Sequence, residues 1–207
     1  MSINVCILNY KSGNVGSVYN MIRYMGYECH ISNEEKYLND ATHIILPGVG
    51  SFKNAMKKIN SSIPIKKLEK EVLIKKKPFL GICVGMQVLA ERGNEFGLEK
   101  GLGWIKGEVN ILKSNKLPLP HICWNSVEVY NKSELTKSLE NTNDFYFVHS
   151  YKFEVENKKE INAFTEYGEK FCSILNKGNI FGVQFHPEKS QKSGMILIKN
   201  FLNFKND

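Results

Sequence analysis

Short apolar runs alternate with amphipathic stretches along the first half of the chain. Apolar runs bounded by turn residues indicate strands, and apolar positions spaced three or four residues apart indicate helices. We therefore expect strands at residues 3–9, 28–32, 43–46 and 78–82, and helices at residues 15–24, 51–59, 64–76 and 84–92. This alternation predicts a parallel sheet with helices on both faces.

From Trp104 onward the pattern changes to short strand candidates joined by loops. We expect strands at residues 109–112, 126–129, 145–148, 161–165, 171–176 and 180–185, and a closing helix at residues 193–204. The pair flanking Gly168 has the pattern of a hairpin. The sequence thus predicts an α/β fold with a flavodoxin-like, open, mostly parallel sheet and a partly antiparallel C-terminal half. We find no repeat or linker, so residues 1–207 are expected to form one domain.

The composition is that of an ordinary globular protein. The chain has 207 residues, of which 42% are hydrophobic and 24% charged, and no apolar run is long enough to span a membrane. The first residues lack a basic and apolar leader, so we expect a cytoplasmic protein that does not bind membranes. The net charge of +7 comes mainly from scattered lysines without interleaved aromatic residues. That pattern favours solvated helix faces over a nucleic-acid site.

The chain has five cysteines, and no two of them form a Cys-x-x-Cys pair. An odd count without such a pair argues against a disulfide framework and against a zinc ribbon. We therefore expect free thiols and no bound metal. One of these thiols is a candidate nucleophile.

The candidate nucleophile is Cys83, in the segment Gly81-Ile82-Cys83-Val84-Gly85 between a predicted strand and a predicted helix. A G-x-C-x-G turn at such a junction is the cysteine form of the nucleophile elbow. Its glycines permit a tight turn, and the N-terminus of the following helix stabilises negative charge on the sulfur. The alternative is a buried structural cysteine in a glycine turn.

A cysteine nucleophile needs an imidazole, which a third group often holds in place. Of five histidines, only His186 has a nearby candidate for that group, because Glu188 follows it by two residues after Pro187. His186 would project from a strand end, at the same edge of the sheet as Cys83, and Glu188 would set its tautomer. The alternative is a strand-end surface histidine. His30 and His43 have the pattern of ordinary strand or loop residues.

The glycine-rich segment Pro47-Gly48-Val49-Gly50 also follows a predicted strand. Backbone N–H groups there can approach a ligand closely, so Gly48, Val49 and Gly50 are candidate donors to an oxyanion. The N–H of Val84, directly after the candidate nucleophile, is a further candidate. A phosphate cradle is the alternative, because a helix follows the loop.

Together these segments resemble the class I (triad) glutamine amidotransferases over nearly the whole chain. A narrower resemblance, to the glutaminase subunits of imidazole glycerol phosphate synthases, rests on longer motifs. They are Pro47-Gly48-Val49-Gly50-Ser51-Phe52, Gly81-Ile82-Cys83-Val84-Gly85-Met86-Gln87, Pro120-His121-Ile122-Cys123-Trp124-Asn125, Tyr146-Phe147-Val148-His149-Ser150-Tyr151 and Gln184-Phe185-His186-Pro187-Glu188-Lys189-Ser190.

The resemblance implies a Cys83, His186 and Glu188 triad that hydrolyses glutamine to glutamate and ammonia through a thioester, with no cofactor. It also implies substrate binding by Gln87, His149, Ser150 and Tyr151. The implied partner is a (β/α)₈-barrel synthase that uses the ammonia to form imidazole glycerol phosphate in histidine biosynthesis. Asn14, Trp124 and Lys189 match positions near that interface.

Two segments depart from the usual family pattern. Cys123 replaces a glycine, and Asn9-Tyr10-Lys11-Ser12 replaces an acidic Asp-Tyr-Gly opening. These departures leave open a paralogous glutaminase that supplies an amino-sugar amidinating synthase in surface-glycan biosynthesis. A non-enzymatic alternative is a flavodoxin-like regulatory module that binds phosphate at residues 47–50, although it leaves the triad residues unexplained.

Overall fold

The computed structural model describes residues 2–139 and 143–205. Within them, the largest sheet has eight strands in the order β2-β1-β3-β4-β14-β13-β12-β9. Their bounds are β1 (Asn4–Ile7), β2 (Glu28–Ile31), β3 (His43–Gly48), β4 (Phe79–Cys83), β9 (Glu128–Val129), β12 (Ile161–Tyr167), β13 (Glu169–Lys177) and β14 (Ile180–Val183).

Strand β14 joins the parallel and antiparallel parts of this sheet. It runs parallel to β4, with Gly182 opposite Gly81, and antiparallel to β13. Strands β2, β1, β3, β4 and β14 are parallel, whereas β13, β12 and β9 pair antiparallel. The predicted fold class is therefore confirmed. Because β3, β4 and β14 run in one direction, their carboxyl ends meet at one edge of the sheet.

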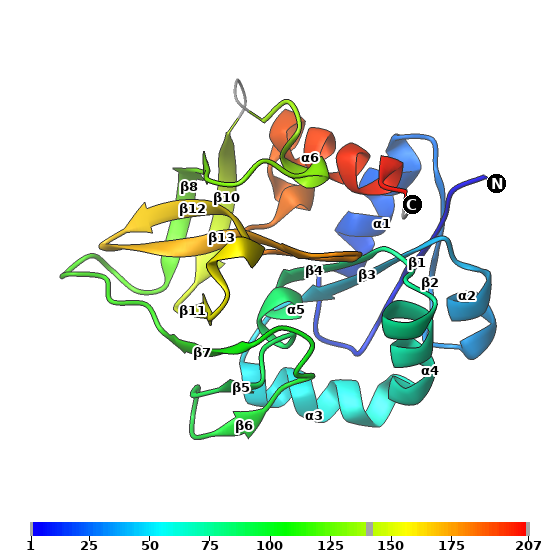
Figure 1. Cartoon of the computed structure of the whole chain (residues 1–207), viewed down its shortest axis with the longest axis horizontal. Helices are drawn as coiled ribbons and strands as arrows, with labels where there is room; N and C mark the ends of the chain where they lie inside the picture. The colour runs from blue at the N-terminus through cyan, green and yellow to red at the C-terminus, as the bar shows by residue number, and fades with distance from the viewer. Residues whose placement is uncertain (1, 140–142, 206–207) are drawn as a thin grey trace.

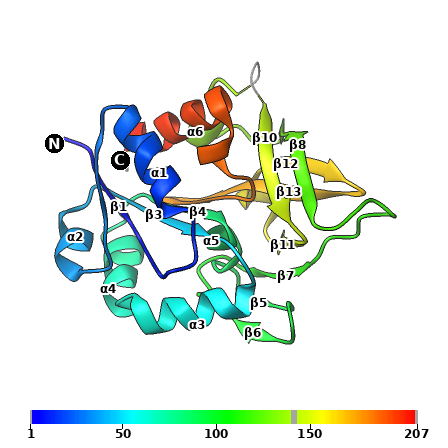
Figure 2. The same cartoon turned by 180° about the vertical axis from the view of Figure 1, so that it is seen from behind.

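Helices cover both faces of the parallel strands. Helices α1 and α6 lie on one side, and α3 and α4 lie on the other (Figures 1 and 2). Both faces of β3 and β4 are buried, which explains why these strands are continuous apolar runs. The helices are α1 (Val15–Tyr24), α2 (Glu35–Asp40), α3 (Phe52–Ser62), α4 (Ile65–Glu69), α5 (Val84–Gln87) and α6 (Gln191–Asn203), with short turns η1 (Lys70–Ile74), η2 (Glu134–Thr136), η3 (Lys158–Glu160) and η4 (Pro187–Lys189).

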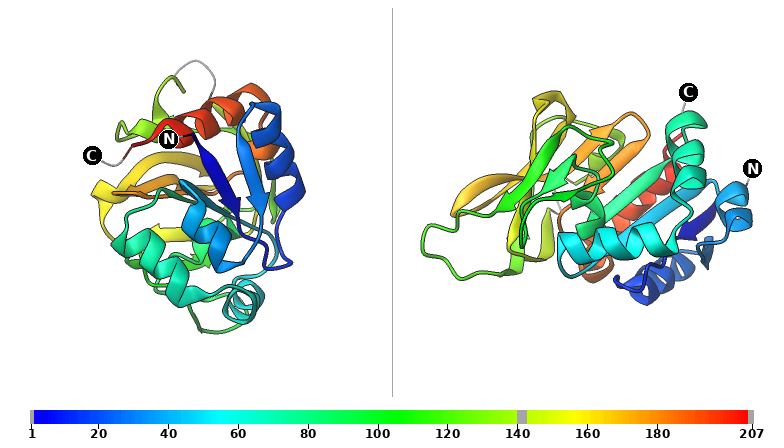
Figure 3. Two further views of the ribbon diagram at one scale, coloured as in Figure 1. Left: turned by 90° about the vertical axis from the view of Figure 1, so that its right-hand side faces the viewer. Right: turned by 90° about the horizontal axis from the view of Figure 1, so that it is seen from below.

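Two smaller sheets come from residues 92–155 and lie beyond one end of the parallel strands (Figure 3). One pairs β8 (His121–Ser126) with β10 (Asp144–His149). The other has the order β11-β7-β5-β6 and contains β5 (Arg92–Gly93), β6 (Glu99–Lys100), β7 (Gly107–Ile111) and β11 (Tyr151–Val155). The sequence pattern indicated β7 and β10 but did not indicate β8 before residue 126, or β11.

The prediction of a helix through residues 84–92 is wrong beyond Gln87. The carbonyls of Val88, Leu89 and Ala90 accept hydrogen bonds from Leu102, Ile105 and Gly103. Residues 102–105 thus donate to the carbonyl groups that a longer helix would use for its own hydrogen bonds. The chain therefore leaves the helix and continues into β5. The predicted helix at residues 64–76 is divided into α4 and a π-helical turn, η1.

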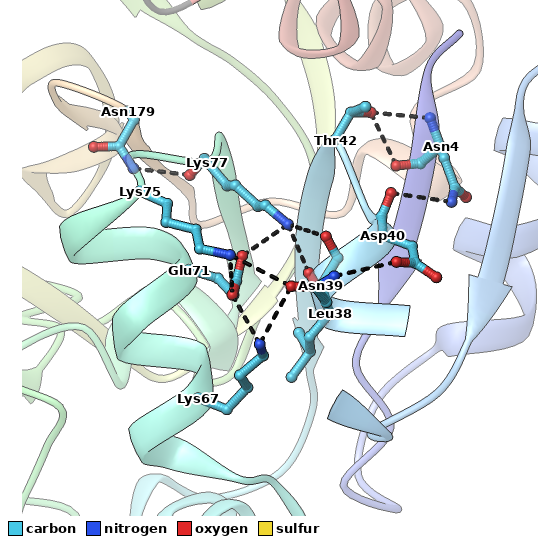
Figure 4. Close-up of polar contacts among 10 residues, drawn as sticks. All are labelled: Asn4, Leu38, Asn39, Asp40, Thr42, Lys67, Glu71, Lys75, Lys77 and Asn179. Carbon is cyan, nitrogen blue, oxygen red and sulfur yellow. Dashed lines mark hydrogen bonds and ion pairs between the residues drawn. The ribbon is translucent and has the colours of Figure 1, made fainter. Parts of the chain in front are cut away.

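A buried carboxylate ties η1 to its surroundings. The Glu71 side chain is wholly covered, and its oxygens lie 2.8–3.0 Å from the ammonium groups of Lys67, Lys75 and Lys77 (Figure 4). Lys77 also donates to the carbonyls of Leu38 and Asn39, so the cluster links η1 to α2. Burial alone would raise the pKa of Glu71, but the lysines outweigh it and lower this pKa to about 2.

We expect Glu71→Gln to lower the free energy of unfolding by about 2 kcal/mol at pH 7, between the values typical of exposed and buried ion pairs. The stabilisation is complete above the ordinary pKa of 4.5 and is lost as the pH falls through about 2. The difference between native and variant should therefore shrink on acidification in urea titrations. Glu134→Gln removes an exposed pair with Lys137 and should change stability by less than about 0.5 kcal/mol. An equal loss in both variants would contradict the assignment.

Candidate active site

Cys83 is the last residue of β4 and adopts an unusual backbone conformation. Its φ is 54° and its ψ is −113°, and helix α5 begins at the next residue. A non-glycine residue with positive φ is strained and persists only where the surrounding structure enforces it. A Cβ at Gly85 would lie 1.9 Å from the Leu46 carbonyl oxygen, and one at Gly81 would lie 2.3 Å from the Gly85 carbonyl oxygen. The two glycines therefore let the turn pack against β3 and against itself.

His186 reaches this turn from the end of β14. Its backbone N–H donates to the Tyr146 carbonyl over 2.9 Å, and its own carbonyl accepts from the Ser190 hydroxyl. These bonds hold the residue between β10 and η4. The imidazole interacts electrostatically with Cys83, and its Nδ1 lies 2.9 Å from Oε1 of Glu188. The fold thus unites three side chains that the sequence separates by up to 105 positions.

The electrostatic setting of His186 favours its charged form. Burial lowers the pKa of the imidazole, but negative charge on Cys83 and the hydrogen bond that the ring donates to Glu188 together raise this pKa to about 10. A protonated imidazole beside the sulfur stabilises a thiolate. Glu188 is itself held by Asn14, whose Nδ2 donates to Oε1 over 3.2 Å. Asn14, a predicted interface residue, therefore contacts the triad carboxylate directly.

A cavity of about 230 Å³ opens above Cys83 and His186. This volume is below the range of about 300–1,000 Å³ usual for drug-sized ligands, and suits a small molecule. A larger hollow beside β7 and β11 is lined by Glu91, Glu108 and Glu154 but contains neither Cys83 nor His186. Of the residues proposed for the site, the smaller cavity is lined by Val49, Gly50, Cys83, Val84, Gln87, His149, Ser150, Tyr151 and His186.

The predicted oxyanion loop lies at the rim of this cavity. The Val49 N–H donates to the Ser12 carbonyl over 3.2 Å, and the Ser12 hydroxyl donates to the Val49 carbonyl over 2.8 Å. In this state the Val49 N–H is directed to Ser12 and away from the cavity. Gly48 packs behind the elbow, where a Cβ would meet the Tyr10 hydroxyl and the Gly85 nitrogen. The Val84 N–H remains next to the sulfur at the start of α5.

Sequence reasoning missed Glu95, which lines the same cavity. Its Oε2 accepts from the Phe52 N–H over 2.7 Å, and burial raises the pKa of this carboxyl. Glu95 supplies an acceptor that suits the ammonium group of an amino-acid ligand. It follows β5 in a segment that the sequence pattern assigned to no element or motif, so no local signal identified it.

His149 is held by a second buried histidine. The rings of His121 and His149 are joined by a 3.0 Å contact between Nδ1 and Nε2, and His149 Nδ1 lies 2.9 Å from the Tyr151 carbonyl. Because a carbonyl only accepts, His149 carries its proton on Nδ1 and accepts from His121. Burial lowers the pKa of His149 to about 3 and that of His121 to about 4. Both histidines therefore stay neutral and brace the segment that follows β10.

Two of the predicted interface residues lie beside the ring of Tyr146. Trp124 is 46% exposed and faces Tyr146 across the β8–β10 pair, with ring centroids 6.1 Å apart. The Lys189 ammonium lies 5.6 Å from the centroid of the same tyrosine ring. Trp124, Tyr146 and Lys189 thus form one contiguous group near the triad.

We expect Gly85→Ala to lower the free energy of unfolding by about 3 kcal/mol, the upper end for overpacking, because its Cβ would collide with backbone. Gly16→Ala is the matched control. It lies inside α1 with open space around it, and should raise stability by up to about 1 kcal/mol. Urea titration of both variants measures the difference. A Gly85→Ala protein as stable as the native chain would show that the elbow does not need this close approach.

Comparison with known proteins places this site in a family. The profile described as "Glutamine amidotransferase class-I" matches residues 6–204. The chain is 45% identical to imidazole glycerol phosphate synthase subunit HisH 2 of Methanococcus maripaludis, over 96% of this chain and 98% of the relative. It is 44% identical to subunit HisH 1 of Campylobacter jejuni, with the same coverage, and 39% identical to subunit HisH of Pelagibacter ubique, over 97% of this chain and 100% of the relative.

Solved structures show the same fold at lower identity. PurLQS from Thermotoga maritima has a TM-score of 0.76 at 20% identity, over 98% of this chain and 99% of that chain. A glutamine amidotransferase from the same organism has a TM-score of 0.66 at 17% identity, over 97% of this chain and 83% of that chain. The match over almost the whole sequence, together with the identity to full-length relatives, shows that this chain is a member of the class I glutamine amidotransferase family.

Proposed function

We propose that this chain is the glutaminase subunit of an imidazole glycerol phosphate synthase, which supplies ammonia for histidine biosynthesis. The observation that carries the proposal is the Cys83, His186 and Glu188 arrangement at one small cavity. Relatives named as subunits of that synthase, 39–45% identical over nearly the whole chain, support the choice of reaction. The same names favour it over the amino-sugar alternative.

The proposed cycle starts with attack of the Cys83 thiolate on the side-chain carboxamide of glutamine. The Val84 N–H and the 48–50 loop stabilise the resulting oxyanion. His186, positioned by Glu188, protonates the departing ammonia and leaves a γ-glutamyl thioester on Cys83. His186 then takes a proton from water, which attacks the thioester and releases glutamate.

The Val49 peptide must turn before its N–H can join the oxyanion site, because Ser12 now holds it. The two hydrogen bonds between Val49 and Ser12 oppose this turn. A loop that assembles the donor set only when needed would limit hydrolysis of glutamine in the absence of an ammonia acceptor.

The other end of the substrate would lie against Glu95 and the His149-Ser150-Tyr151 segment. Glu95 matches the α-ammonium group by charge, and the backbone of the segment braced by His121 suits the α-carboxylate. Gln87 uses its amide hydrogens on the Tyr151 carbonyl and on Gln184, so its Oε1 is the group left to accept from the ligand.

The proposed partner is a (β/α)₈-barrel synthase subunit that receives the ammonia. The residues proposed to contact this subunit are Asn14, Trp124 and Lys189. Asn14 is hydrogen-bonded to Glu188, and Trp124 and Lys189 lie beside Tyr146. No helix within residues 2–139 and 143–205 has the length and apolar character of a membrane span. We propose a cytoplasmic location, which the five unpaired cysteines support.

The direct test is glutamate and ammonia release from glutamine, measured with and without the barrel subunit and its phosphorylated ribulose ligand. We expect release to rise when that subunit and its ligand are present, and to vanish in Cys83→Ala, which lacks the nucleophile. An amino-sugar synthase tested in parallel should give no stimulation. Retained hydrolysis by Cys83→Ala would refute the assigned nucleophile, and stimulation only by the amino-sugar synthase would refute the assigned pathway.

Glu188→Gln should lower kcat for glutamine hydrolysis by about 100-fold or more, because the neutral amide does not enforce the tautomer and charge of His186. The KM should change less, since Glu188 does not line the cavity. Glu128→Gln is the control, because Glu128 on β9 forms an exposed ion pair with Lys170 on β13. Steady-state kinetics of the complex measure both values, and native kcat in Glu188→Gln would contradict the triad.

A further inference from the structure

The Cys83 sulfur has a further polar neighbour, the side-chain amide of Gln184. Its Nε2 donates to Sγ over 3.7 Å, and the Gln184 side chain is completely buried. Gln184 directly follows β14 and precedes His186 by two residues. Gln184 and His186 both lie beside the sulfur, whereas Phe185 between them stacks on Phe145. Two hydrogen-bond donors from one strand end therefore converge on the nucleophile.

The orientation of the Gln184 amide is fixed by its neighbours. Its Oε1 accepts from Gln87 Nε2 over 3.0 Å, so its own NH₂ group must face the sulfur. Gln87 is anchored in turn by a 2.9 Å hydrogen bond to the Tyr151 carbonyl. The Gln184 backbone N–H donates to the Ser173 carbonyl over 3.0 Å. The donor is thus in place before any substrate arrives.

The Gln184 amide favours the thiolate, whereas the Val148 carbonyl favours the thiol. The thiol donates to the Val148 carbonyl over 3.8 Å, a contact that a thiolate cannot make, whereas the Gln184 amide can donate to either form. A hydrogen bond to an ionised acceptor is stronger than one to a neutral acceptor. The titratable groups that interact with the sulfur are His186 and, from the segment after β1, Tyr10; Glu188 acts through His186. Gln184 does not titrate, so its amide donates at any pH.

We propose that Gln184 is a further catalytic residue, whose amide N–H stabilises the Cys83 thiolate before attack and again when the thioester is broken. This inference rests on the proposed glutaminase function. In the first step an electron pair on Sγ forms the bond to the carboxamide carbon, and the sulfur loses its negative charge. In hydrolysis the C–S bond breaks and the pair returns to Sγ, where the Gln184 amide and His186 again face it. Gln184 keeps its protons throughout, and glutamine and water are the only reactants.

The test measures the rate at which iodoacetamide alkylates Cys83 as a function of pH, followed by mass spectrometry of the peptide that contains this cysteine. Gln184→Met removes the donor at similar length, and we expect alkylation at pH 7 to slow about tenfold and the half-maximal rate to move to higher pH. Gln184→Glu keeps an acceptor for Gln87 but places a carboxylate beside the sulfur, so its loss should be larger. A merely structural role would not shift the pH profile.

The matched control is Gln191→Glu, because Gln191 is exposed at the start of α6. This variant should keep the native rate and profile. If Gln184→Met is alkylated at the native rate with the native pH profile, the proposal is refuted, whatever the result for Gln184→Glu. If circular dichroism shows that Gln184→Met does not fold, native behaviour of Gln184→Glu overturns it instead. The assay uses the free chain without glutamine, so a failure of ammonia release would refute the proposed function while leaving this result intact.

Discussion

The close packing of the turn after β4 against the end of β3 is the constraint on which the rest of the site depends. The backbone at Gly85 lies against the Leu46 carbonyl, and Gly48 lies against the peptide between Val84 and Gly85. This approach accompanies the positive φ of Cys83, and α5 begins at the next residue. On the other side of β4, Gly182 of β14 packs on the Met86 side chain of the same short helix. A side chain at Gly85 or Gly48 would collide with backbone and disrupt the packing of the turn against β3.

The antiparallel second half of the chain supplies the remaining walls of the site. Strand β10 fixes the His186 backbone through the Tyr146 carbonyl and places the Val148 carbonyl beside the sulfur. Its partner β8 brings His121 opposite His149. The parallel half therefore presents the nucleophile, and the antiparallel half determines what surrounds it. This division explains why both halves are needed for one cavity of about 230 Å³.

Three buried histidines near the sulfur show how environment sets the charge of one residue type. His149 and His121 have only neutral hydrogen-bond partners, so burial dominates and their pKa values fall to about 3 and about 4. His186 is buried too, but Cys83 and Glu188 supply negative charge, and its pKa rises to about 10. The site thus concentrates positive charge on the one imidazole that contacts the sulfur. The neutral His121 and His149 instead support the segment that follows β10 through their hydrogen bonds.

The sequence by itself determined the elements whose physical cause is local, and it predicted the residues that we propose as the triad. Apolar runs with flanking turn residues identified β1 to β4 and α1, and the glycines around Cys83 required a tight turn, since only glycine tolerates such close backbone approach. Tertiary structure alone decided the end of α5, because the competing hydrogen-bond donors come from residues 102–105. It also decided the roles of Glu95 and Gln184, whose partners lie 43 and 101 positions away. The spacing of apolar residues reflects interactions between residues that are close in sequence. The contacts of Glu95, Gln184 and α5 instead depend on which distant segments the fold brings together.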